Sequence, residues 1–466
     1  MPKIMTAEQK HQMMTETPIN SLIMRMAIPS IISMLVTSLY NMADTFFIGQ
    51  LNNVPATASI GIVFPLMNII QAIGFFLGQG SGNTVSRLLG KKDMENAERT
   101  VATGFFGAII MGLVFTTLGL AFIEPLMKVL GATETIMPYA IGYGKYIMIG
   151  STFKLASIVL NVQMRFQGNA FFSMIGIATG AVLNIFLDPL FIHTFGMGVE
   201  GAAIATAISQ CVSFLLLLGG TYKGGNIRLK LKAFTLKWSI VKPIVLGGMP
   251  SMCRQGLASV ANICMNLAAT TYGGVTPEAI DAAVAALGVV NRIMQFCASC
   301  IMGIGQGFQP VCGFNYGAKK YGRVRKGFMF TLEVMVVIMI VFSIVGITFP
   351  GQIVAIFNND PTVIEFGTVT LRWQCLVFPL MSVVFNANMA MQTMGMAGRS
   401  TVLSMARQGV CFIPMILILP PIIGATGIQI AQACADAFAF AITVPMLLPV
   451  LKMLKQKDEE QNKLSA

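Results

Sequence analysis

The sequence of 466 residues is 55% hydrophobic and only 11% charged, with a mean hydropathy of +0.74. A typical soluble domain is about 25% charged, so this composition excludes a soluble globular protein and indicates an integral membrane protein. The net charge of +12 also occurs in nucleic-acid-binding proteins, so the positions of the basic residues must decide what it means.

Runs of about 20 apolar residues, the length that crosses a bilayer, recur along the whole chain. Several are longer than the bilayer is thick, which predicts tilted or kinked helices. The length of the runs, and the lack of segments with alternating polarity, favour helices over strands. The twelve predicted spans are residues 21–51, 56–88, 98–123, 136–160, 168–193, 198–222, 238–273, 279–314, 326–349, 362–392, 400–422 and 426–451.

The polar segment before the first span lacks the short apolar core of a removable signal peptide, so we expect the first span itself to direct insertion. Within that span Pro29 is a candidate bending element. Asp44 lies in the same span, where a carboxylate costs about 2.5–3.5 kcal/mol and by default marks a transport or proton-handling site. Asp188 is a second carboxylate inside a predicted span, the fifth.

Asn184 and Asp188 are four residues apart and therefore share one face of the fifth helix. Together with Asp44 and Thr206 they offer carboxylate, amide and hydroxyl oxygens, which suit a small hard cation. Alternatively, the two carboxylates share a proton, and the sequence leaves sodium and proton coupling equally open. In a purely structural alternative, Asp188 caps or kinks the helix at the Asp-Pro step and Asp44 pairs with Lys154.

The basic residues fall on alternate connections between the spans, which the positive-inside rule explains without nucleic-acid binding. Both termini are then cytoplasmic and the number of spans is even; only Lys128 breaks the alternation. The basic positions are Lys3, Lys10, Arg87, Lys91, Lys92, Arg99, Arg165, residues 223–242, residues 319–326, Arg399 and the tail from Lys452.

Short motifs recur at a spacing that settles near 227 residues. The glycine-rich Gly78–Gly80 returns as Gly305–Gly307, and Asn161 with Gly168 returns as Asn388 with Gly395. Six spans per half give both halves the same orientation, so the repeats are parallel and related by a pseudo-two-fold axis along the membrane normal. We predict an all-α membrane protein with residues 1–20 cytoplasmic, an N-lobe at 21–222, a basic linker at 223–237, a C-lobe at 238–451 and a tail at 452–466.

Few residues or motifs of the sequence support an enzymatic function. His11 and His193 are the only histidines, and both lie outside or at the edge of the spans. Residues 196–201 satisfy GxGxxG but have no preceding strand, and no Walker-type phosphate loop exists, so direct ATP drive is excluded. The nine cysteines, including Cys297 and Cys300, are expected to be small buried hydrophobic residues. We expect no cofactor, only a transported sodium ion or proton.

Several motifs together resemble the multidrug and toxic compound extrusion (MATE) family, in particular a bacterial branch of DinF and MepA type. The resemblance extends from about Thr17 to Leu454. It implies a two-lobed, twelve-helix antiporter that exports organic cations and other drugs in exchange for sodium ions or protons. We expect a small, amphipathic organic cation as substrate and a bacterial inner membrane as location. We also expect function as a monomer, because a two-lobed chain can form its own pathway. The motifs are the run from Tyr40 to Gly49, the run from Asn184 to Pro189, the stretch ending at Thr206 and the duplicated Gly-Gln-Gly.

Residue by residue, the resemblance implies that Asp44 and Asp188 are the carboxylates of the N-lobe cation site. Asn184 and Thr206 match its neutral oxygen donors, Tyr143 matches a hydrogen-bonding tyrosine, and Asp436 matches an acid in the last helix. Another branch of the family has a second sodium site formed by acids of the seventh and tenth helices. Here the seventh helix carries Arg254 and no acid, and the tenth has only Glu365 near its outer end.

Arg254, Arg292 and Arg372 also lie within predicted spans, where each forms a structural pair or takes part in gating or substrate contact. Three functions remain at this point. A cation-coupled drug exporter is the first, a flippase for lipid-linked precursors is the second, and a passive channel is the third. A flippase would favour a larger cationic central cavity, to which these three arginines could contribute.

Overall fold

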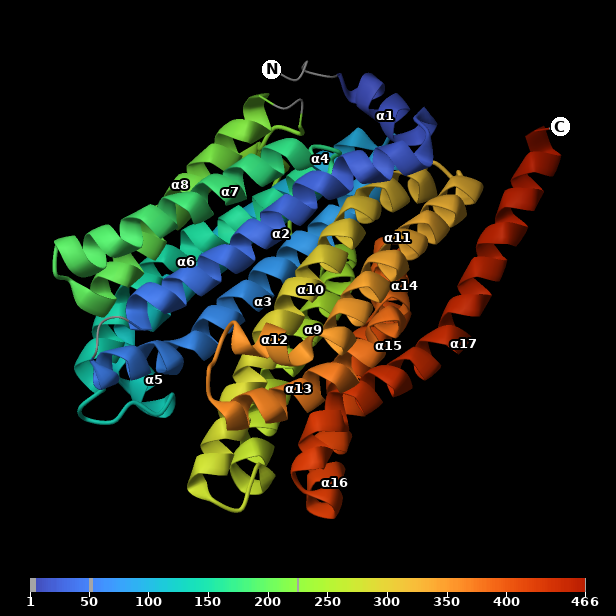
Figure 1. Cartoon of the computed structure of the whole chain (residues 1–466). Coiled ribbons are helices and arrows are strands. Elements are labelled where there is room, and N and C mark those ends of the chain that lie inside the picture. The colour runs from blue at the N-terminus through green and yellow to red at the C-terminus, as the bar shows by residue number, and fades with distance from the viewer. Residues whose placement is uncertain (1–5, 50–52, 224–225, 466) are drawn as a thin grey trace.

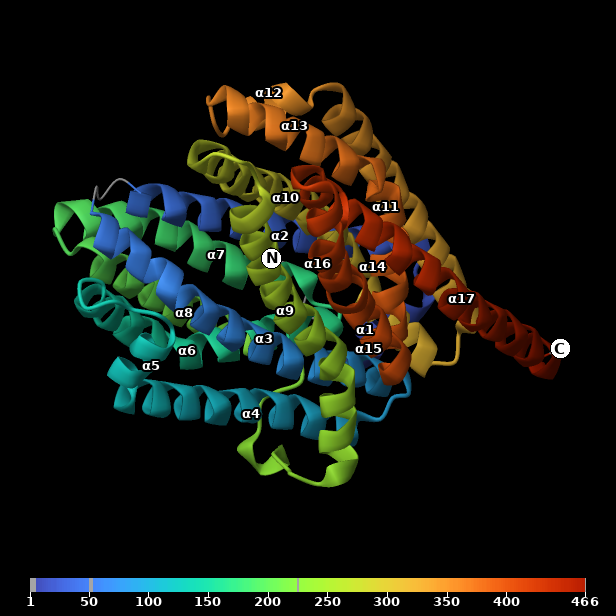
Figure 2. The ribbon, with the colours of Figure 1, turned by 90° about the horizontal axis from the view of Figure 1, so that it is seen from below.

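The computed structural model describes residues 6–49, 53–223 and 226–465, and these residues form a bundle of long helices in two groups (Figure 1, Figure 2). The predicted N-terminal segment, the end of the first span and the linker are therefore described only in part. We call α2–α8 the N-lobe and α9–α17 the C-lobe. The N-lobe contains α2 (Ile19–Gly49), α3 (Val54–Gly90), α4 (Met94–Ala121), α5 (Ile123–Val129), α6 (Met137–Phe166), α7 (Ala170–Pro189), the π-helical turn η1 (Leu190–Thr194) and α8 (Gly198–Lys223).

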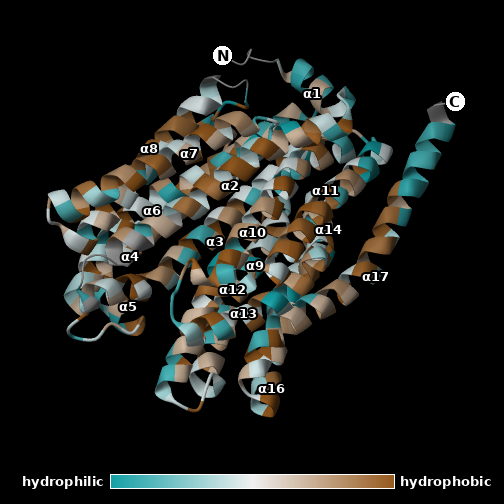
Figure 3. Cartoon of the chain, in the orientation of Figure 1, coloured by the Kyte–Doolittle hydropathy of each residue, from teal (hydrophilic) through white to brown (hydrophobic). Residues whose placement is uncertain are grey.

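The C-lobe repeats this arrangement with more interruptions. It contains α9 (Trp238–Tyr272), α10 (Pro277–Gly317), α11 (Tyr321–Thr348), α12 (Pro350–Ala355), α13 (Pro361–Leu376), α14 (Phe378–Thr393), α15 (Ala397–Met405), the π-helical segment η3 (Ala406–Cys411), α16 (Phe412–Ile423) and α17 (Ala425–Ser465). Apolar residues cover the middle of the bundle, whereas polar residues gather on the short helix α1 (Ala7–Glu16) and on the far end of α17 (Figure 3).

Ten helices of the described chain are long and apolar enough to cross a membrane, and the bent pair α13–α14 together forms another such span. Helix α9 has the length of a span, 35 residues, but is more polar because it includes Arg254, Asn262 and Asn266. It packs along α3 within the bundle, so it completes a set of twelve membrane-crossing elements (Figure 2).

Three of the twelve elements are broken where proline interrupts helical hydrogen bonding. Helices α13 and α14 meet at a bend of 54°, and Pro379 follows at the start of α14. A π-helical turn follows Pro189 at the end of α7, and another precedes Pro414 in α16. Proline removes one backbone donor and collides with the preceding turn, which accounts for breaks at these places. By contrast, α2 continues through Pro29.

The internal repeat predicted from motifs extends to hydrogen bonds and backbone angles. The Asn161 side chain donates to the carbonyl of Ser173 at 3.0 Å, and Asn388, 227 positions later, donates to the carbonyl of Ser400 at 2.7 Å. Gly168 and Gly395 have φ of 82° and 83°, a left-handed conformation that glycine adopts readily. Lys92 and Lys319 are the same distance apart and share a left-handed φ of 60° and 61°. The two lobes therefore share local geometry as well as helix order.

The two lobes meet closely through glycine. A Cβ added at Gly80 in α3 would collide with the backbone of Ile244 in α9, and one added at Gly307 in α10 would collide with the backbone of Ala27 in α2. The contacts of α3 and α10 are thus related by the repeat. Further along, Ser38 of α2 and Ser299 of α10 lie 2.9 Å apart between their hydroxyl oxygens. Because all these contacts need small side chains, the glycines allow the helix backbones to pack tightly.

Candidate functional site

The two intramembrane acids of the N-lobe face each other. Asp44 lies near the end of α2 and Asp188 near the end of α7, and these two helices pack side by side. Their carboxyl groups come within hydrogen-bonding reach of one another. Asp188 has no exposed surface, and neither of its oxygens, nor Oδ1 of Asp44, accepts a hydrogen bond from any described residue. Two carboxyl groups in this position need a proton or a cation between them.

Neutral oxygen atoms surround this pair. The side chain of Asn184 donates to the hydroxyl of Thr206 at 3.4 Å, and its own Oδ1 accepts no hydrogen bond from a described residue. Both side chains are buried, at 1% and 3% exposure. The structure therefore brings the four residues Asp44, Asp188, Asn184 and Thr206 into one cluster, which we call the N-lobe acid site. Its unpaired oxygens are the donor set that a hard monovalent cation or a shared proton requires.

Two tyrosines border the N-lobe acid site. Tyr143 is 1% exposed, and its hydroxyl contacts the sulfur of Met67 at 3.9 Å, close enough to Asp44 and Asp188 to interact with their charge. Tyr40 lies beside Thr206 and both acids, although sequence reasoning did not nominate it. Tyr40 could have been predicted from the sequence, because it lies four residues before Asp44 and therefore on the same face of α2.

The structural alternatives for these acids are not supported by the geometry. Lys154 of α6 is near enough to Asp44 to interact electrostatically, but no ion pair within 4.0 Å joins them among the described residues. Asp188 does not cap a helix, because α7 passes directly into the π-helical turn η1 and the carboxyl accepts no backbone N–H.

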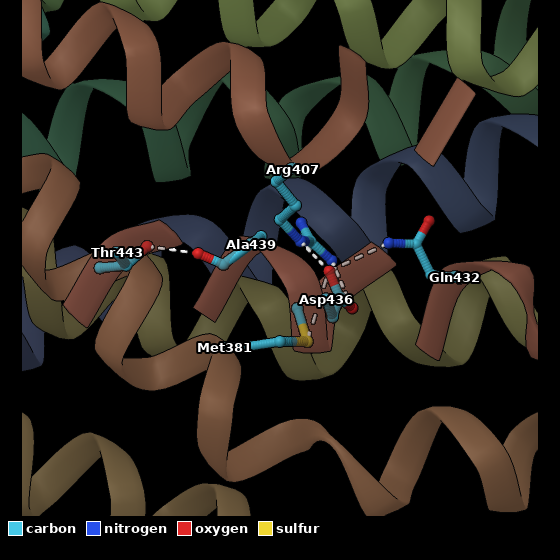
Figure 4. A network of polar contacts seen from close by, with 6 residues as sticks. All are labelled: Met381, Arg407, Gln432, Asp436, Ala439 and Thr443. Atoms are coloured by element: carbon cyan, nitrogen blue, oxygen red, sulfur yellow. Dashed lines mark hydrogen bonds and ion pairs between the residues drawn. The ribbon is translucent and has the colours of Figure 1, made fainter. Parts of the chain in front are cut away.

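Asp436 is in a different environment, in the middle of the C-lobe. Its carboxylate accepts two bonds from the Arg407 guanidinium, at 2.6 Å and 3.4 Å, and one from the Gln432 amide at 3.1 Å (Figure 4). The basic partner of Asp436 therefore comes from η3 and not from its own helix. The guanidinium also lies 5.2 Å from the ring centre of Phe385. This acid already has its counter-ion.

The remaining predicted residues lie apart from the N-lobe acid site. Arg254 of α9 donates to Asn388 at 3.5 Å, whereas Arg292 of α10 and Arg372 of α13 have exposed side chains. Pro29 lies near the opposite end of α2 from Asp44. The nine cysteines are free thiols, and among the described residues no group of three His, Cys, Asp or Glu side chains could hold a metal ion.

Known proteins share both the sequence pattern and the fold. The family model described as MatE matches residues 29–190 and again residues 257–418. The chain belongs to the MATE family. MATE proteins are transporters and not enzymes. The double match agrees with the internal repeat, because each match covers the corresponding part of one lobe.

Individual relatives support the MATE assignment over nearly the full length. The chain is 27% identical to the multidrug export protein MepA of Staphylococcus aureus (strain MRSA252), covering 94% of this chain and 95% of that one. It is 27% identical to MepA of Staphylococcus haemolyticus (strain JCSC1435), with coverage of 89% and 90%. A solved MATE structure in complex with MaL6 superposes with a TM-score of 0.89 at 25% identity, covering 96% of this chain and 99% of that chain.

A solved MOP superfamily transporter from Pyrococcus furiosus superposes with a TM-score of 0.88 at 25% identity, covering 96% of this chain and 99% of that one. These similarities confirm the prediction of a twelve-helix, two-lobed membrane protein. The chain is a multi-pass MATE transporter of the membrane.

Proposed function

We propose that this MATE transporter is a secondary antiporter that exports organic, often cationic and amphipathic, drugs or toxic metabolites from the cytoplasm in exchange for inward sodium ions or protons. The observation that carries the proposal is the pair formed by the half-buried Asp44 and the buried Asp188, which face each other without an ion-paired basic residue among those described. Such a pair is unfavourable unless a mobile cation visits it. The relatives that are multidrug export proteins support the drug substrate.

Exchange requires that the coupling ion and the drug weaken each other's binding. In the proposed cycle, the ion loads the N-lobe acid site, rearranges the N-lobe and lowers its affinity for the drug. The site joins two spans, because Asp44 belongs to α2 and Asp188 to α7. Neutralising the pair therefore changes how these two spans pack against each other. Sodium and proton coupling both fit the oxygen set. The protein works as a monomer, since one chain supplies both lobes.

The proposed orientation places both termini in the cytoplasm of a bacterial cell, and the protein in its inner membrane. Basic side chains near both termini and on the alternate connections support this placement under the positive-inside rule. One monovalent cation moving inward across about 150 mV then provides roughly 3.5 kcal/mol. That energy supports on the order of a 300-fold gradient of a neutral drug.

Transport by purified protein in liposomes tests the proposal. An imposed sodium or pH gradient should drive efflux of a fluorescent organic cation, and Asp44→Asn or Asp188→Asn should slow this efflux at least about tenfold, because an amide cannot hold the coupling ion by charge. Asp281→Asn, an exposed acid at the start of α10, is the matched control and should transport normally. Wild-type rates in both site variants would show that the N-lobe acid site does not couple ions.

The flippase alternative receives no specific support. The flippase hypothesis depended on arginines that line a cationic cavity. However, Arg254 donates a hydrogen bond to Asn388, and the side chains of Arg292 and Arg372 are exposed. These three arginines lie on α9, α10 and α13, and no described contact joins them. A passive channel would carry the organic cation without reciprocal ion movement, which the liposome experiment measures directly.

A further inference from the structure

Lys154 is a basic residue close enough to the N-lobe acid site for its charge to act on Asp44. It lies in the central part of α6, which runs from Met137 to Phe166, and its side chain is half-buried. A lysine at this depth is expensive to keep and is a candidate functional group by position alone. Its electrostatic partner is Asp44, yet the two form no ion pair within 4.0 Å among the described residues. The ammonium is thus near the acids without being bound to them.

The neighbours of Lys154 on α6 show that it points into the lobe. Gly150 and Ile158 lie one turn before and after it, so the three residues share a face of the helix. Ile158 packs on α3, where a Cβ added at Gly74 would lie 2.8 Å from its Cδ1. Gly150 packs on α8, where an added Cβ would lie 3.3 Å from Cα of Ala207. Lys154 therefore extends between α3 and α8, inside the N-lobe, and not toward lipid.

The formal charges of this cluster determine how many monovalent cations make it neutral. Two ionised carboxylates and one ammonium give a net charge of minus one, and the other groups around them, Asn184, Thr206 and the tyrosines, are neutral. One monovalent cation makes the cluster neutral, whereas a second would leave it positive in a poorly solvated interior. We propose that Lys154 is a resident counter-charge that limits the N-lobe acid site to one coupling cation per transport cycle.

This inference rests on the proposed antiport function and adds its stoichiometry. With one cation entering for each monovalent drug that leaves, no net charge crosses the membrane, so the membrane potential neither drives nor opposes the exchange. Replacing Lys154 by methionine shortens the side chain by one atom, the ammonium nitrogen, and raises the negative charge of the cluster to two. The variant then needs two cations for neutrality, and its exchange for a monovalent drug moves one net charge inward.

The experiment measures ion stoichiometry in liposomes that contain the full-length protein, with ethidium as the monovalent substrate. Net ethidium flux is followed at a fixed sodium or pH gradient while the membrane potential is set with potassium and valinomycin. For the wild type, the ratio of internal to external ethidium concentration at zero net flux should not depend on the membrane potential, which means one cation per cycle. For Lys154→Met the ratio should shift about tenfold for each tenfold change in the potassium ratio, which means two cations per cycle.

Two further variants separate charge from structure. Lys154→Arg keeps the positive charge and should retain a stoichiometry of one. Lys145→Met removes an exposed lysine of the same helix, whose ammonium lies 5.9 Å from the ring centre of Tyr146, and should also retain one. A stoichiometry of one in Lys154→Met would overturn the inference, because a group with a purely structural role changes rate or stability but not the number of ions.

Binding measurements decide the case in which Lys154→Met folds but does not transport. If sodium is the coupling ion, the bound ²²Na⁺ at saturation should rise from one per wild-type protein to two per variant. If the proton is the coupling ion, the protons released when ethidium binds should rise in the same ratio. Equal counts would overturn the inference. Ethidium efflux without any ion counterflow in the wild type would instead refute the proposed antiport function itself.

Discussion

At the scale of single residues, the buried acids of the two lobes show how the surroundings decide the role of a carboxylate. Asp188 and Asp436 have 0% and 2% exposure, so burial does not distinguish them. Asp436 is held by the Arg407 guanidinium and the Gln432 amide, whereas Asp188 forms no ion pair with a described basic residue. A carboxylate with a bidentate guanidinium partner already has a counter-charge, so it does not need a visiting cation. We therefore assign Asp436 to the stability of the C-lobe.

Removing one partner of this ion pair should destabilise the protein more than removing both. Arg407→Met leaves the buried Asp436 with only Gln432, at a cost of about 3–5 kcal/mol, and the double variant Arg407→Met/Asp436→Leu should recover much of that loss. Thermal unfolding in detergent, analysed as a double-mutant cycle, measures the coupling. The control Arg399→Met removes an exposed arginine of the neighbouring helix α15 and should leave the unfolding temperature unchanged. Additive effects of the two substitutions would contradict the assignment.

At the scale of helices, the sequence was sufficient for what depends on local pattern. Apolar run length gave the spans, and the spacing of Asn184 and Asp188 placed two site residues on one face of α7. The break between α13 and α14 and the π-helical segment η3 were not predicted, because hydropathy averages over the few residues that interrupt hydrogen bonding. Arg407 was missed for a related reason: it reaches Asp436 from another element, 29 positions away, and sequence spacing contains no such information.

Helix α1 is an element whose role becomes visible only in the structure. It lies across the end of the bundle and joins both lobes: His11 contacts the carbonyl of Gly90 at 3.2 Å, and Asn315 donates to the carbonyl of Met14 at 3.0 Å. Lys10 donates to Asn226 of the linker at 3.2 Å. Burial lowers the pKa of Lys10 from 10.5 to about 8, so the attached helix disfavours the charged form of this side chain.

The attachment of α1 should therefore strengthen as pH rises from about 8 toward 10.5. In that window a detached Lys10 binds more protons than an attached one, and below it both forms are charged, so this group contributes no further pH dependence. A spin label at Gln12→Cys, an exposed position of α1, reports the mobile fraction, which should fall between pH 8 and pH 9.5. Lys10→Met should abolish this slope, whereas Lys92→Met, which breaks the exposed pair with Glu8, should keep it. An unchanged slope in Lys10→Met would assign the pH effect to another group.

At the scale of the whole molecule, the lobes are joined where glycine lets backbones touch. The contacts of α3 with α9 and of α10 with α2 leave no room for a Cβ, so they pack well only in one relative position of the lobes. Hydrogen bonds also cross between the lobes, including one from Arg165 of α6 to Gln306 of α10 at 2.8 Å. Alternating access by movement of one lobe against the other has to break this interface in every cycle.

Locking the interface should therefore stop transport. In a background without the nine native cysteines, Ser38→Cys and Ser299→Cys place two thiols where the hydroxyl oxygens now lie 2.9 Å apart, α2 on one side and α10 on the other. Oxidation should abolish ethidium efflux from liposomes, because the lobes can no longer part, and reduction should restore it. Each single variant should transport under both conditions. Full efflux by the cross-linked protein would show that α2 and α10 stay together throughout the cycle, and that the lobes separate elsewhere.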